Sequence, residues 1–433
     1  MNTFAVIGNV DAGKSSLIGV LNSKELDNGK GKARESITNL KHEKISGNTT
    51  NGNLIKIKKD NNFIRLLDIA GHDRYFNNSM RAITEFNPSY ALLVVSSVKG
   101  IDDISSLVNI SDVNKLSKGK IIQNMNKTYL TVCGILQIPI IVVITKIDNC
   151  TNEQLANTKN DIITYMKALK YKSYITVNED NFEKISYDYN NNSNIYLPIF
   201  TVSNVTGENI ELLNNFLFRV EVRDNYPKGK EQLYKFAQKE NFKNLFEIYN
   251  TYRVKGKGLI VHGRVKLGQF KTQDEFNIGP FSNGYMKVRI RSIHDDSRSP
   301  AEILTEGMYG CLCIKNVNNK EKLTKKMLRR GKVVTDYNEY FTEITCSSRV
   351  GHHQTTIEKK YRSYIHCNNI GDTVTIVEAD KFPMRSSENH AIKFKFSNNQ
   401  FIYPGSKFVI RDDNIKIYGL VTTVFKHEKF TNI

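Results

Sequence analysis

Short apolar runs, each followed by glycine or polar residues, set the pattern of the first half of the chain. They occupy residues 4–7, 64–67 and 138–144, and another precedes Thr201. A short continuous apolar run bounded by turn residues is typical of a strand that is buried on both faces, as in a parallel sheet. The pattern therefore predicts a doubly wound, mostly parallel α/β sheet whose ligand binds at the carboxyl ends of the strands.

The pattern changes beyond about residue 245, where alternating runs of β-branched and aromatic residues are separated by Gly, Pro and Asn. Helical periodicity is weak there, and small all-β barrels fit such a pattern. Because 433 residues exceed what one hydrophobic core usually organises, several domains are expected. We predict an α/β domain over 1–222, a linker over 223–244, and two β-barrel domains over 245–337 and 338–433.

The first apolar run leads into a glycine-rich loop. Residues 8–15 read Gly-x-x-x-x-Gly-Lys-Ser between a predicted strand and a predicted helix. A loop that enters a helix N-terminus points backbone N–H groups inward, and a lysine there places a cation against the β- and γ-phosphates. A chance glycine turn is the alternative, which the strand–loop–helix context disfavours. The residues expected at this phosphate site are Asn9, Val10, Asp11, Ala12, Gly13, Lys14, Ser15 and Ser16, with Gly8 at the start of the loop.

The second apolar run ends in Asp68-x-x-Gly71. Phosphate-loop enzymes place a Mg²⁺ contact and a γ-phosphate contact at this point. An ordinary turn is the common alternative for a strand that ends in Asp and Gly, but the position after a phosphate loop favours a site. We therefore expect Ser15 and Asp68 at a Mg²⁺ ion and Gly71 at the γ-phosphate.

The third run ends in Thr145, Lys146 and Asp148, which resemble the guanine-reading motif of GTPases. Guanine presents N1–H and its 2-amino group as adjacent donors, so one carboxylate accepts both, whereas adenine has an acceptor at N1. Asp148 is therefore expected to select GTP over ATP. GTPases usually have Asn where this chain has Thr145, so a short hydroxyl replaces an amide that ties the base to the phosphate loop.

A fourth apolar run precedes the segment where GTPases close over the guanine O6 with backbone N–H groups. The residues expected there are Ser203, Asn204 and Val205.

Composition changes this picture mainly through charge. The formal net charge is +18, and residues 241–433 carry +13 of it. A basic half can neutralise nucleic-acid phosphates, although a lysine-rich bias gives the same excess without any ligand. No apolar run reaches the roughly 20 residues that span a bilayer. The six cysteines lack zinc or disulfide spacing, and we interpret them as buried thiols, with Cys311 and Cys313 on one face of a strand.

Longer segments carry a resemblance to one family. It lies in GNVDAGKSSLIGVL, ELDNGKGKAR, KHEKISGNTT, DIAGHDRY, TKID and VSNVTGEN, which are similar to the GTP-binding protein 1 and 2 group of the elongation factor Tu superfamily. Gly263, Arg264 and Val265 resemble a turn in the second domain of these proteins, and residues 346–367 and 404–421 resemble their third domain. The resemblance implies an α/β P-loop GTPase domain followed by two all-β barrel domains.

The same resemblance implies a translation-factor-like switch that binds GTP and GDP with Mg²⁺ and hydrolyses GTP slowly without a ribosome or other activating partner. Its catalytic residues would be His72, which orients the attacking water, and Lys14. Thr49, with Thr50 as the adjacent alternative, would contact Mg²⁺ only in the GTP form. Loss of the γ-phosphate would release Thr49 and Gly71 and relax both switch segments.

Aminoacyl-tRNA and the ribosome are the partners that the resemblance implies, for a monomeric, cytoplasmic protein. The alternative is a GTP-dependent adaptor in RNA turnover or surveillance without tRNA delivery. The GTPase subunit of a sulfate-activating enzyme ranks last, because the barrel segments resemble the first group more closely. His352, His353 and Arg411 lie in matching third-domain segments, where such residues are usually only solvated. The basic run 320–332 either contacts RNA or is a solvated turn.

Overall fold

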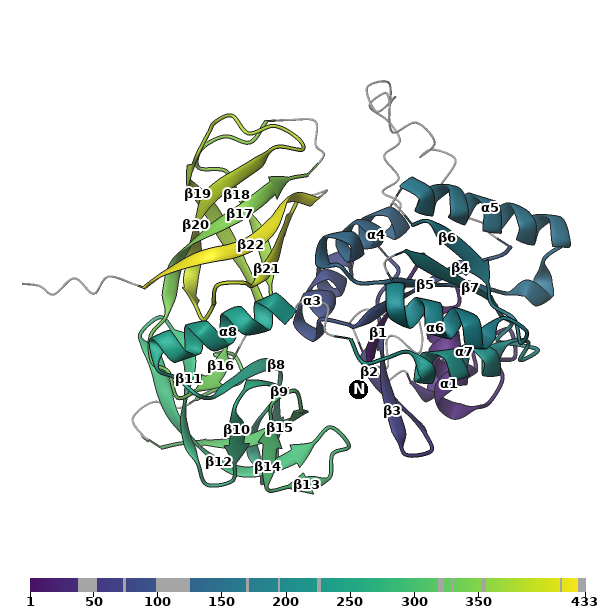
Figure 1. Cartoon of the computed structure of the whole chain (residues 1–433). Coiled ribbons are helices and arrows are strands. Elements are labelled where there is room, and N and C mark those ends of the chain that lie inside the picture. Colours follow the sequence, from purple (N-terminus) through teal and green to yellow (C-terminus); the bar gives the residue numbers. More distant parts are fainter. Residues whose placement is uncertain are drawn as a thin grey trace, which may run out of the picture. The chain divides into compact units, whose positions relative to one another are not determined.

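The computed structural model describes residues 1–37, 53–72, 75–98, 125–168, 171–193, 195–223, 227–317, 323–328, 331–351, 356–412 and 415–426. The chain divides into two compact units, Met1–Asn225 and Tyr226–Ile433 (Figure 1). The first is a sheet with helices, and the second contains two β-barrels. The predicted fold class, an α/β domain followed by two all-β barrels, is therefore confirmed.

The sheet of the first unit has the strand order β2-β3-β1-β4-β5-β7-β6 among the described residues. Every pairing is parallel except that of β2 with β3. The four apolar runs of the sequence form β1, β3, β5 and β7, because strands covered on both faces need apolar side chains on both. The strands are β1 (Thr3–Ile7), β2 (Asn53–Lys59), β3 (Asn62–Asp68), β4 (Tyr90–Ser96), β5 (Ile140–Thr145), β6 (Ser173–Thr176) and β7 (Tyr196–Thr201).

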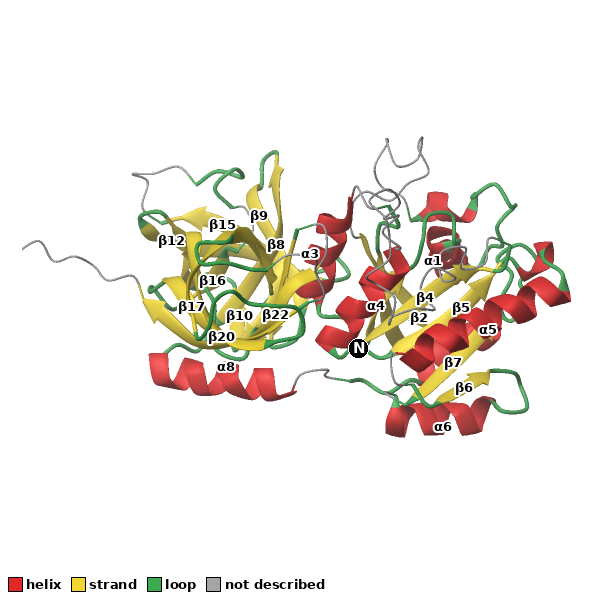
Figure 2. Cartoon of the chain, turned by 90° about the horizontal axis from the view of Figure 1, so that it is seen from above, coloured by secondary structure: helices red, strands yellow, loops and turns green. Residues whose placement is uncertain are grey.

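Helices lie on both faces of this sheet (Figure 2). Helices α1, α6 and α7 share one core with it, in which Leu17, Tyr189 and Phe216 are buried. Right-handed crossovers that run in the opposite direction along the sheet place α3, α4 and α5 on the other face. The helices are α1 (Lys14–Ser23), α3 (Phe76–Phe86), α4 (Met125–Leu136), α5 (Asn152–Ala168), α6 (Phe182–Asn192) and α7 (Ile210–Arg219), with short 3₁₀ turns at Ala33–Ser36 and Ile147–Asn149.

The first barrel of the second unit is the ring β11-β16-β8-β9-β15-β12, which the pairing of β11 with β12 closes. Its core includes the buried side chains of Phe246, Val261 and Leu312. Cys311 and Cys313 on β15 are free thiols, half-buried and buried respectively. The strands are β8 (Leu245–Val254), β9 (Gly258–Leu267), β10 (Gln269–Lys271), β11 (Glu275–Phe281), β12 (Gly284–Asp295), β13 (Pro300–Ala301), β14 (Ile303–Thr305), β15 (Tyr309–Asn316) and β16 (Val333–Thr335).

The second barrel is closed in the order β17-β20-β19-β18-β21-β22. Alternate residues point inward, and Ile344, Ile365 and Phe394 lie in its core. The strands are β17 (Phe341–Val350), β18 (Arg362–Cys367), β19 (Ile370–Ala379), β20 (Asn389–Gln400), β21 (Lys407–Arg411) and β22 (Ile415–Lys426).

Helix α8 (Pro227–Glu240) lies within the segment 223–244, for which the sequence predicts a linker. Leu233 and Phe236 are spaced as neighbours on one helix face and are buried in the same core cluster as the second barrel. The Phe236 ring lies 5.9 Å from that of Phe341, measured between centroids. The helix is therefore part of the second unit.

Side-chain amides join the two barrels. Asn369 Nδ2 donates to the carbonyl oxygens of Ile248 at 3.3 Å and Lys332 at 2.9 Å. Asn399 Nδ2 donates to the carbonyl oxygen of Phe281 at 2.8 Å. An asparagine side chain is short, so these hydrogen bonds tolerate little displacement of one barrel against the other. This agrees with the grouping of both barrels in one compact unit.

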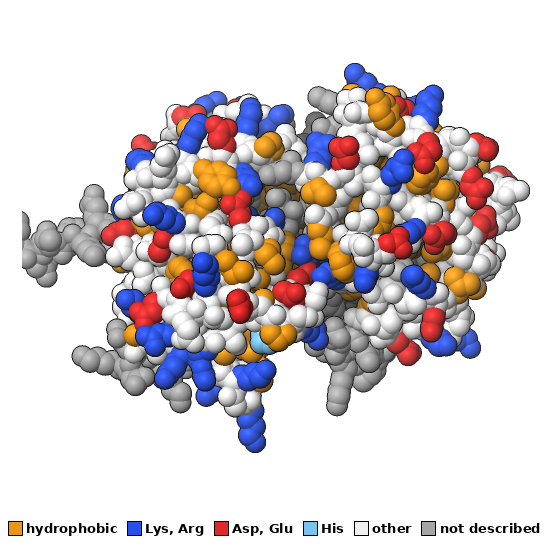
Figure 3. Space-filling view, turned by 60° about the horizontal axis from the view of Figure 1, so that its bottom comes forward, with side chains coloured by type: hydrophobic (Ala, Val, Ile, Leu, Met, Phe, Trp, Pro, Cys, Tyr) orange, Lys and Arg blue, Asp and Glu red, His pale blue; other side chains and the backbone are white. Residues whose placement is uncertain are grey.

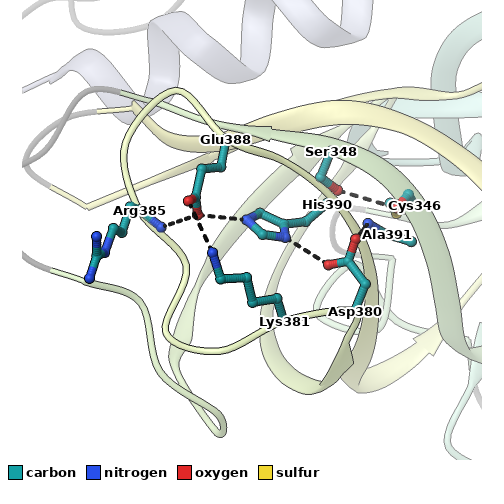
Figure 4. A network of polar contacts seen from close by, with 8 residues as sticks. All are labelled: Cys346, Ser348, Asp380, Lys381, Arg385, Glu388, His390 and Ala391. Carbon is teal, nitrogen blue, oxygen red and sulfur yellow. Dashed lines mark hydrogen bonds and ion pairs between the residues drawn. The ribbon is translucent and has the colours of Figure 1, made fainter.

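A charged network closes the connection between β19 and β20 (Figure 4). His390 Nδ1 lies 2.7 Å from Asp380 Oδ1, and its Nε2 lies 3.1 Å from Glu388 Oε2. Glu388 also accepts the backbone N–H of Arg385 at 2.8 Å and pairs with Lys381 at 3.5 Å. The Arg385 N–H, followed by the His390 hydrogen bond, lowers the pKa of Glu388 to about 2.

The substitution Glu388→Gln tests this network. Because the pKa of Glu388 is lower in the folded chain, its carboxylate stabilises the fold above the ordinary value of 4.5, and this contribution is lost as the pH falls towards 2. We expect wild type to be more stable than Glu388→Gln at about pH 7, by a margin that shrinks steadily below about pH 5. Urea unfolding followed by circular dichroism measures the margin, and a margin independent of pH contradicts the assignment.

Candidate functional site

The glycine-rich loop connects β1 to α1 at the carboxyl edge of the first sheet. A Cβ at Gly8, where φ is 148°, would lie 2.3 Å from the carbonyl oxygen of Val94 on β4. The loop thus runs against the backbone of β4, which excludes a side chain at this position. Helix α1 begins at Lys14, so the N–H groups of its first turn point towards the loop, where they would suit an anion. Of the other predicted loop residues, Asn9, Val10, Asp11, Ser15 and Ser16 are at least partly exposed, and Ala12 is buried.

Lys14 lies at the centre of this loop. Its side chain is buried, and Nζ donates to the carbonyl oxygens of Gly8 at 3.0 Å and Asn9 at 2.8 Å. Burial lowers the pKa of Lys14 to about 8, with Asp68 and Asp11 acting in the opposite direction. Among the described residues its hydrogen-bond acceptors are carbonyl oxygens, so an anion bound at the loop would add a direct charge partner for the buried ammonium.

Gly71 lies directly against this lysine. A Cβ at Gly71 would be 2.4 Å from Lys14 Nζ and 3.0 Å from the carbonyl carbon of Asn9. The Asp-x-x-Gly motif therefore touches the phosphate loop, as the sequence predicts for two motifs that share a phosphate. A side chain at position 71 would therefore require the Lys14 ammonium to move.

Ser15 and Asp68, the two described residues that the sequence assigns to Mg²⁺, lie together. Val6 on β1 is opposite Asp68 on β3 in the parallel register, which places the end of β3 beside the loop. Ser15 Oγ donates to Asp68 Oδ2 at 2.9 Å. A hydroxyl and a carboxylate oxygen fit Mg²⁺, which prefers hard oxygen ligands. Thr49 and Thr50 lie outside the described residues.

The residues that the sequence predicts to read the base meet at the ends of β5 and β7. Asp148 lies in the 3₁₀ turn after β5, and Ser203 Oγ donates to its Oδ1 at 2.5 Å. The same Ser203 oxygen accepts the N–H groups of Val205 at 3.2 Å and Thr206 at 3.0 Å. Ser203 therefore orients the carboxylate and also fixes the loop that would close over the base.

Lys146, the third member of this motif, has a left-handed backbone with φ 61°. Ser97, at the end of β4, donates to its carbonyl oxygen at 2.9 Å. Sequence reasoning misses Ser97, because a serine after a strand carries no signal of its own.

Thr145 and Asn204 both bond to the phosphate loop, a tie that one asparagine makes in most GTPases. Thr145 Oγ1 donates to the carbonyl oxygen of Ala12 at 2.7 Å. Asn204 Nδ2 reaches the carbonyl oxygen of Gly13 at 3.5 Å, and both side chains lie 3.4 Å from the place of a Gly13 Cβ. Asn204 Oδ1 is buried and has no hydrogen-bond partner among the described residues. The amide that GTPases usually have at position 145 is thus supplied by Asn204, in the next motif. From the sequence, that motif is expected to act only through its backbone N–H groups.

His72 follows Gly71 and is exposed. Its ring lies 6.2 Å from the ring of Tyr75 in an edge-on arrangement. Its neighbours Asp73 and Arg74 lie outside the described residues. The position beside the phosphate loop agrees with the predicted role, and the role itself stays a prediction.

The remaining candidates lie elsewhere. His352 and His353 fall outside the described residues, whereas Arg411 is half-buried at the end of β21. Within the run 320–332, the described Lys325 and Lys326 are exposed. In the described ranges, no group of three His, Cys, Asp or Glu side chains is arranged to hold a metal ion. No described helix is long and apolar enough to cross a membrane.

The model of the elongation factor Tu GTP binding domain matches residues 1–241. The chain belongs to the elongation factor Tu family. The match includes each motif described above, from the phosphate loop to Ser203, and extends through α8. The predicted resemblance is thereby confirmed, and the first unit is the GTP-binding domain of this family.

One named relative and two solved structures are similar to nearly the whole chain. GTP-binding protein 1 of Xenopus laevis is 28% identical over 452 residues, which cover 98% of this chain and 63% of the relative. The chain therefore spans less than two thirds of that protein's length. A bacterial selenocysteine-specific elongation factor, EF-Sec, has a TM-score of 0.65 at 18% identity, covering 97% of this chain and 58% of that one. The GTPase-like domain of Ski7 from S. cerevisiae has a TM-score of 0.65 at 13% identity, covering 97% of both chains. These two likenesses show the fold alone.

The pH dependence of nucleotide affinity tests the state of Lys14. With a pKa of about 8, this family member loses the ammonium above that pH, so binding a phosphate then requires proton uptake. We expect the affinity for GDP to weaken between about pH 8 and pH 9, by at most about tenfold per pH unit. Fluorescence titration with labelled GDP measures it. Lys14→Met is expected to bind GDP weakly and with an affinity that does not depend on pH in this range. Lys24→Met, at the exposed end of α1, should keep the pH dependence of the wild type. A wild-type affinity that does not change with pH contradicts the lowered pKa of Lys14.

Asn204→Ala tests the divided task of Thr145 and Asn204. Asn204 contacts the loop and not the γ-phosphate side, so we expect the affinities for GDP and for a GTP analogue to fall by the same factor, about three- to tenfold. The double variant Thr145→Asn/Asn204→Ala returns an amide to the position where the family usually has it, and should recover most of the loss. Unchanged affinity in Asn204→Ala would show that Thr145 suffices.

Proposed function

We propose that this chain binds GTP and GDP together with Mg²⁺ and hydrolyses GTP as a translation-factor-like switch. The observation that carries the proposal is that four separate motifs converge at the carboxyl edge of one sheet. Gly71 lies against Lys14, Ser15 is bonded to Asp68, and Ser203 is bonded to Asp148. The family model, described as a GTP binding domain, supports the choice of nucleotide.

Guanine selectivity rests on Asp148. Its carboxylate accepts the N1–H and the 2-amino group of guanine, and Ser203 holds it in place for both. The backbone N–H groups after Ser203 then close over O6. An adenine base would set its N1 acceptor against the carboxylate, so ATP is disfavoured.

Hydrolysis needs neutralised phosphate charge and a positioned water. Ser15 and Asp68 would hold a Mg²⁺ ion, which would supply positive charge to the phosphates. Lys14 and the first-turn N–H groups of α1 hold the phosphates, and the N–H of Gly71 faces the γ-phosphate. His72 orients the attacking water. Because the His72 side chain is exposed, a bound partner can contact it and set its position, and slow hydrolysis is therefore expected of the isolated chain.

A basic surface on the first barrel supports RNA as that partner, or as part of it. It consists of Arg253, Lys255, Lys257, Arg291 and Lys315, which are all exposed on β8, β12, β15 and the hairpin between β8 and β9. None of the five forms an ion pair with a described residue. Cys313 Sγ on β15 lies 3.2 Å from the carbonyl oxygen of Lys257 in the hairpin. Lys and Arg side chains gather along one border of the barrel unit (Figure 3).

Unpaired exposed cations on a rigid barrel bind phosphates and release counterions. We therefore propose that the chain engages aminoacyl-tRNA and the ribosome when it carries GTP. We also propose a cytoplasmic location, with which the free cysteines are compatible. A monomer is the simplest oligomeric state for such a factor. In the competing proposal, the same switch is an adaptor in RNA turnover that does not deliver tRNA.

Filter binding of charged and uncharged tRNA, across a salt series, tests the proposal on protein loaded with a non-hydrolysable GTP analogue or with GDP. Charged tRNA retained only in the GTP form supports a delivery factor. If tRNA binding depends on neither the nucleotide nor the aminoacyl group, a non-specific basic surface explains it, and the adaptor proposal is favoured.

Charge reversal of two lysines provides the matched comparison. Lys255→Glu/Lys257→Glu, on the basic surface, is expected to weaken tRNA binding and to reduce the slope of log affinity against log salt by about two. Lys228→Glu/Lys239→Glu removes the same charge from the exposed side of α8 and should change the slope little. Equal effects of both pairs would mean that net charge alone drives binding.

A further inference from the structure

The carbonyl group of Ala70 receives two side-chain donors from different helices. Tyr129 on α4 donates its hydroxyl to the Ala70 oxygen at 2.5 Å. Ser79 Oγ on α3 lies 3.3 Å from the same oxygen and 3.4 Å from the carbonyl oxygen of Tyr75, so its one proton is shared between these two acceptors. Ala70 lies between Asp68 and Gly71, the two residues of the Asp-x-x-Gly motif that serve the metal and phosphate site. Neither Tyr129 nor Ser79 belongs to a motif of the nucleotide site.

These contacts fix the direction of one peptide group. In a trans peptide the C=O and the following N–H point in opposite directions. Because the Ala70 carbonyl points at α3 and α4, the N–H of Gly71 points away from both helices. Gly71 itself lies against the phosphate loop, where its Cβ would be 2.4 Å from Lys14 Nζ.

Burial makes this direction costly to change. Ala70, Tyr129 and Ser79 are at most 1% exposed. If the peptide rotated, the Ala70 carbonyl would leave both hydroxyl donors, and buried polar groups would lose partners that water cannot replace. The two donors therefore favour one orientation of the peptide strongly.

We propose that Tyr129 and Ser79 are positioning residues that hold the Ala70–Gly71 peptide with its N–H towards the γ-phosphate of GTP. The proposal rests on the proposed GTP function and adds to it a contact from α4, distant in sequence from the motif. Since GDP has no γ-phosphate, the hydroxyl of Tyr129 contributes to the binding of GTP and not to that of GDP. Tyr129 thereby sets how well the site discriminates the two nucleotides.

The substitution Tyr129→Phe removes the donor and keeps the ring. Titration of the full chain with fluorescent GDP and with a fluorescent non-hydrolysable GTP analogue, both with Mg²⁺, gives the ratio of the two dissociation constants. We expect affinity for the GTP analogue to fall about tenfold and affinity for GDP to stay within about twofold, because only a fraction of the peptides then faces the γ-phosphate.

Tyr189→Phe is the matched control. The Tyr189 hydroxyl is also buried and also donates to a backbone carbonyl, that of Ile140 at 3.2 Å. Ile140 begins β5, at the edge of the sheet opposite the nucleotide site. If the loss of a buried hydroxyl acts only on the structure, Tyr189→Phe shows the same effect as Tyr129→Phe. The ratio of the dissociation constants for GDP and the GTP analogue should change only in Tyr129→Phe.

Ser79→Ala removes the second, longer hydrogen bond and should shift the ratio in the same direction by a smaller factor. If Tyr129→Phe does not fold, the ratio of the two dissociation constants measured for Ser79→Ala tests the proposal instead. Equal losses for both nucleotides, or an unchanged ratio, overturn the positioning role while leaving GTP binding intact. A wild type that binds neither nucleotide overturns the proposed function itself.

Discussion

The parallel register of β1 with β3 and β4 is the constraint on which the nucleotide site depends. It sets Val6 opposite Asp68 and brings the backbone of Val94 against Gly8. Because parallel strands end at the same edge of a sheet, motifs far apart in the chain open onto one space. The candidate anion site at the start of α1 and the closeness of Ser15 to Asp68 follow from this alignment.

The site keeps its chemistry although one motif departs from the family pattern. Thr145 replaces the usual asparagine, and the side chain of Asn204 supplies an amide near the same glycine. What the site requires is a hydrogen bond that ties the base-reading loop to the phosphate loop, and the geometry allows either residue to make it. A motif read one position at a time therefore underestimates how well the site is held together.

The second unit combines a fixed scaffold with a basic exterior. Short amides lock the two barrels together, and α8 packs into the core of the second, so charges on the first barrel are carried on a rigid body.

The sequence by itself determined the fold class, and it located the phosphate loop, the Asp-x-x-Gly motif and the candidate guanine-reading aspartate. These depend on residue types within a few positions of one another, such as the glycine turn before Lys14 and the apolar run before Asp148. The sequence predicts a linker where α8 forms, because the burial of Leu233 and Phe236 depends on a barrel that follows later in the chain. Only the tertiary structure decided that Asn204 meets Gly13, that Ser97 holds Lys146 and that Tyr129 holds Ala70. Such contacts follow from strand order and helix placement, which no local pattern of residues specifies.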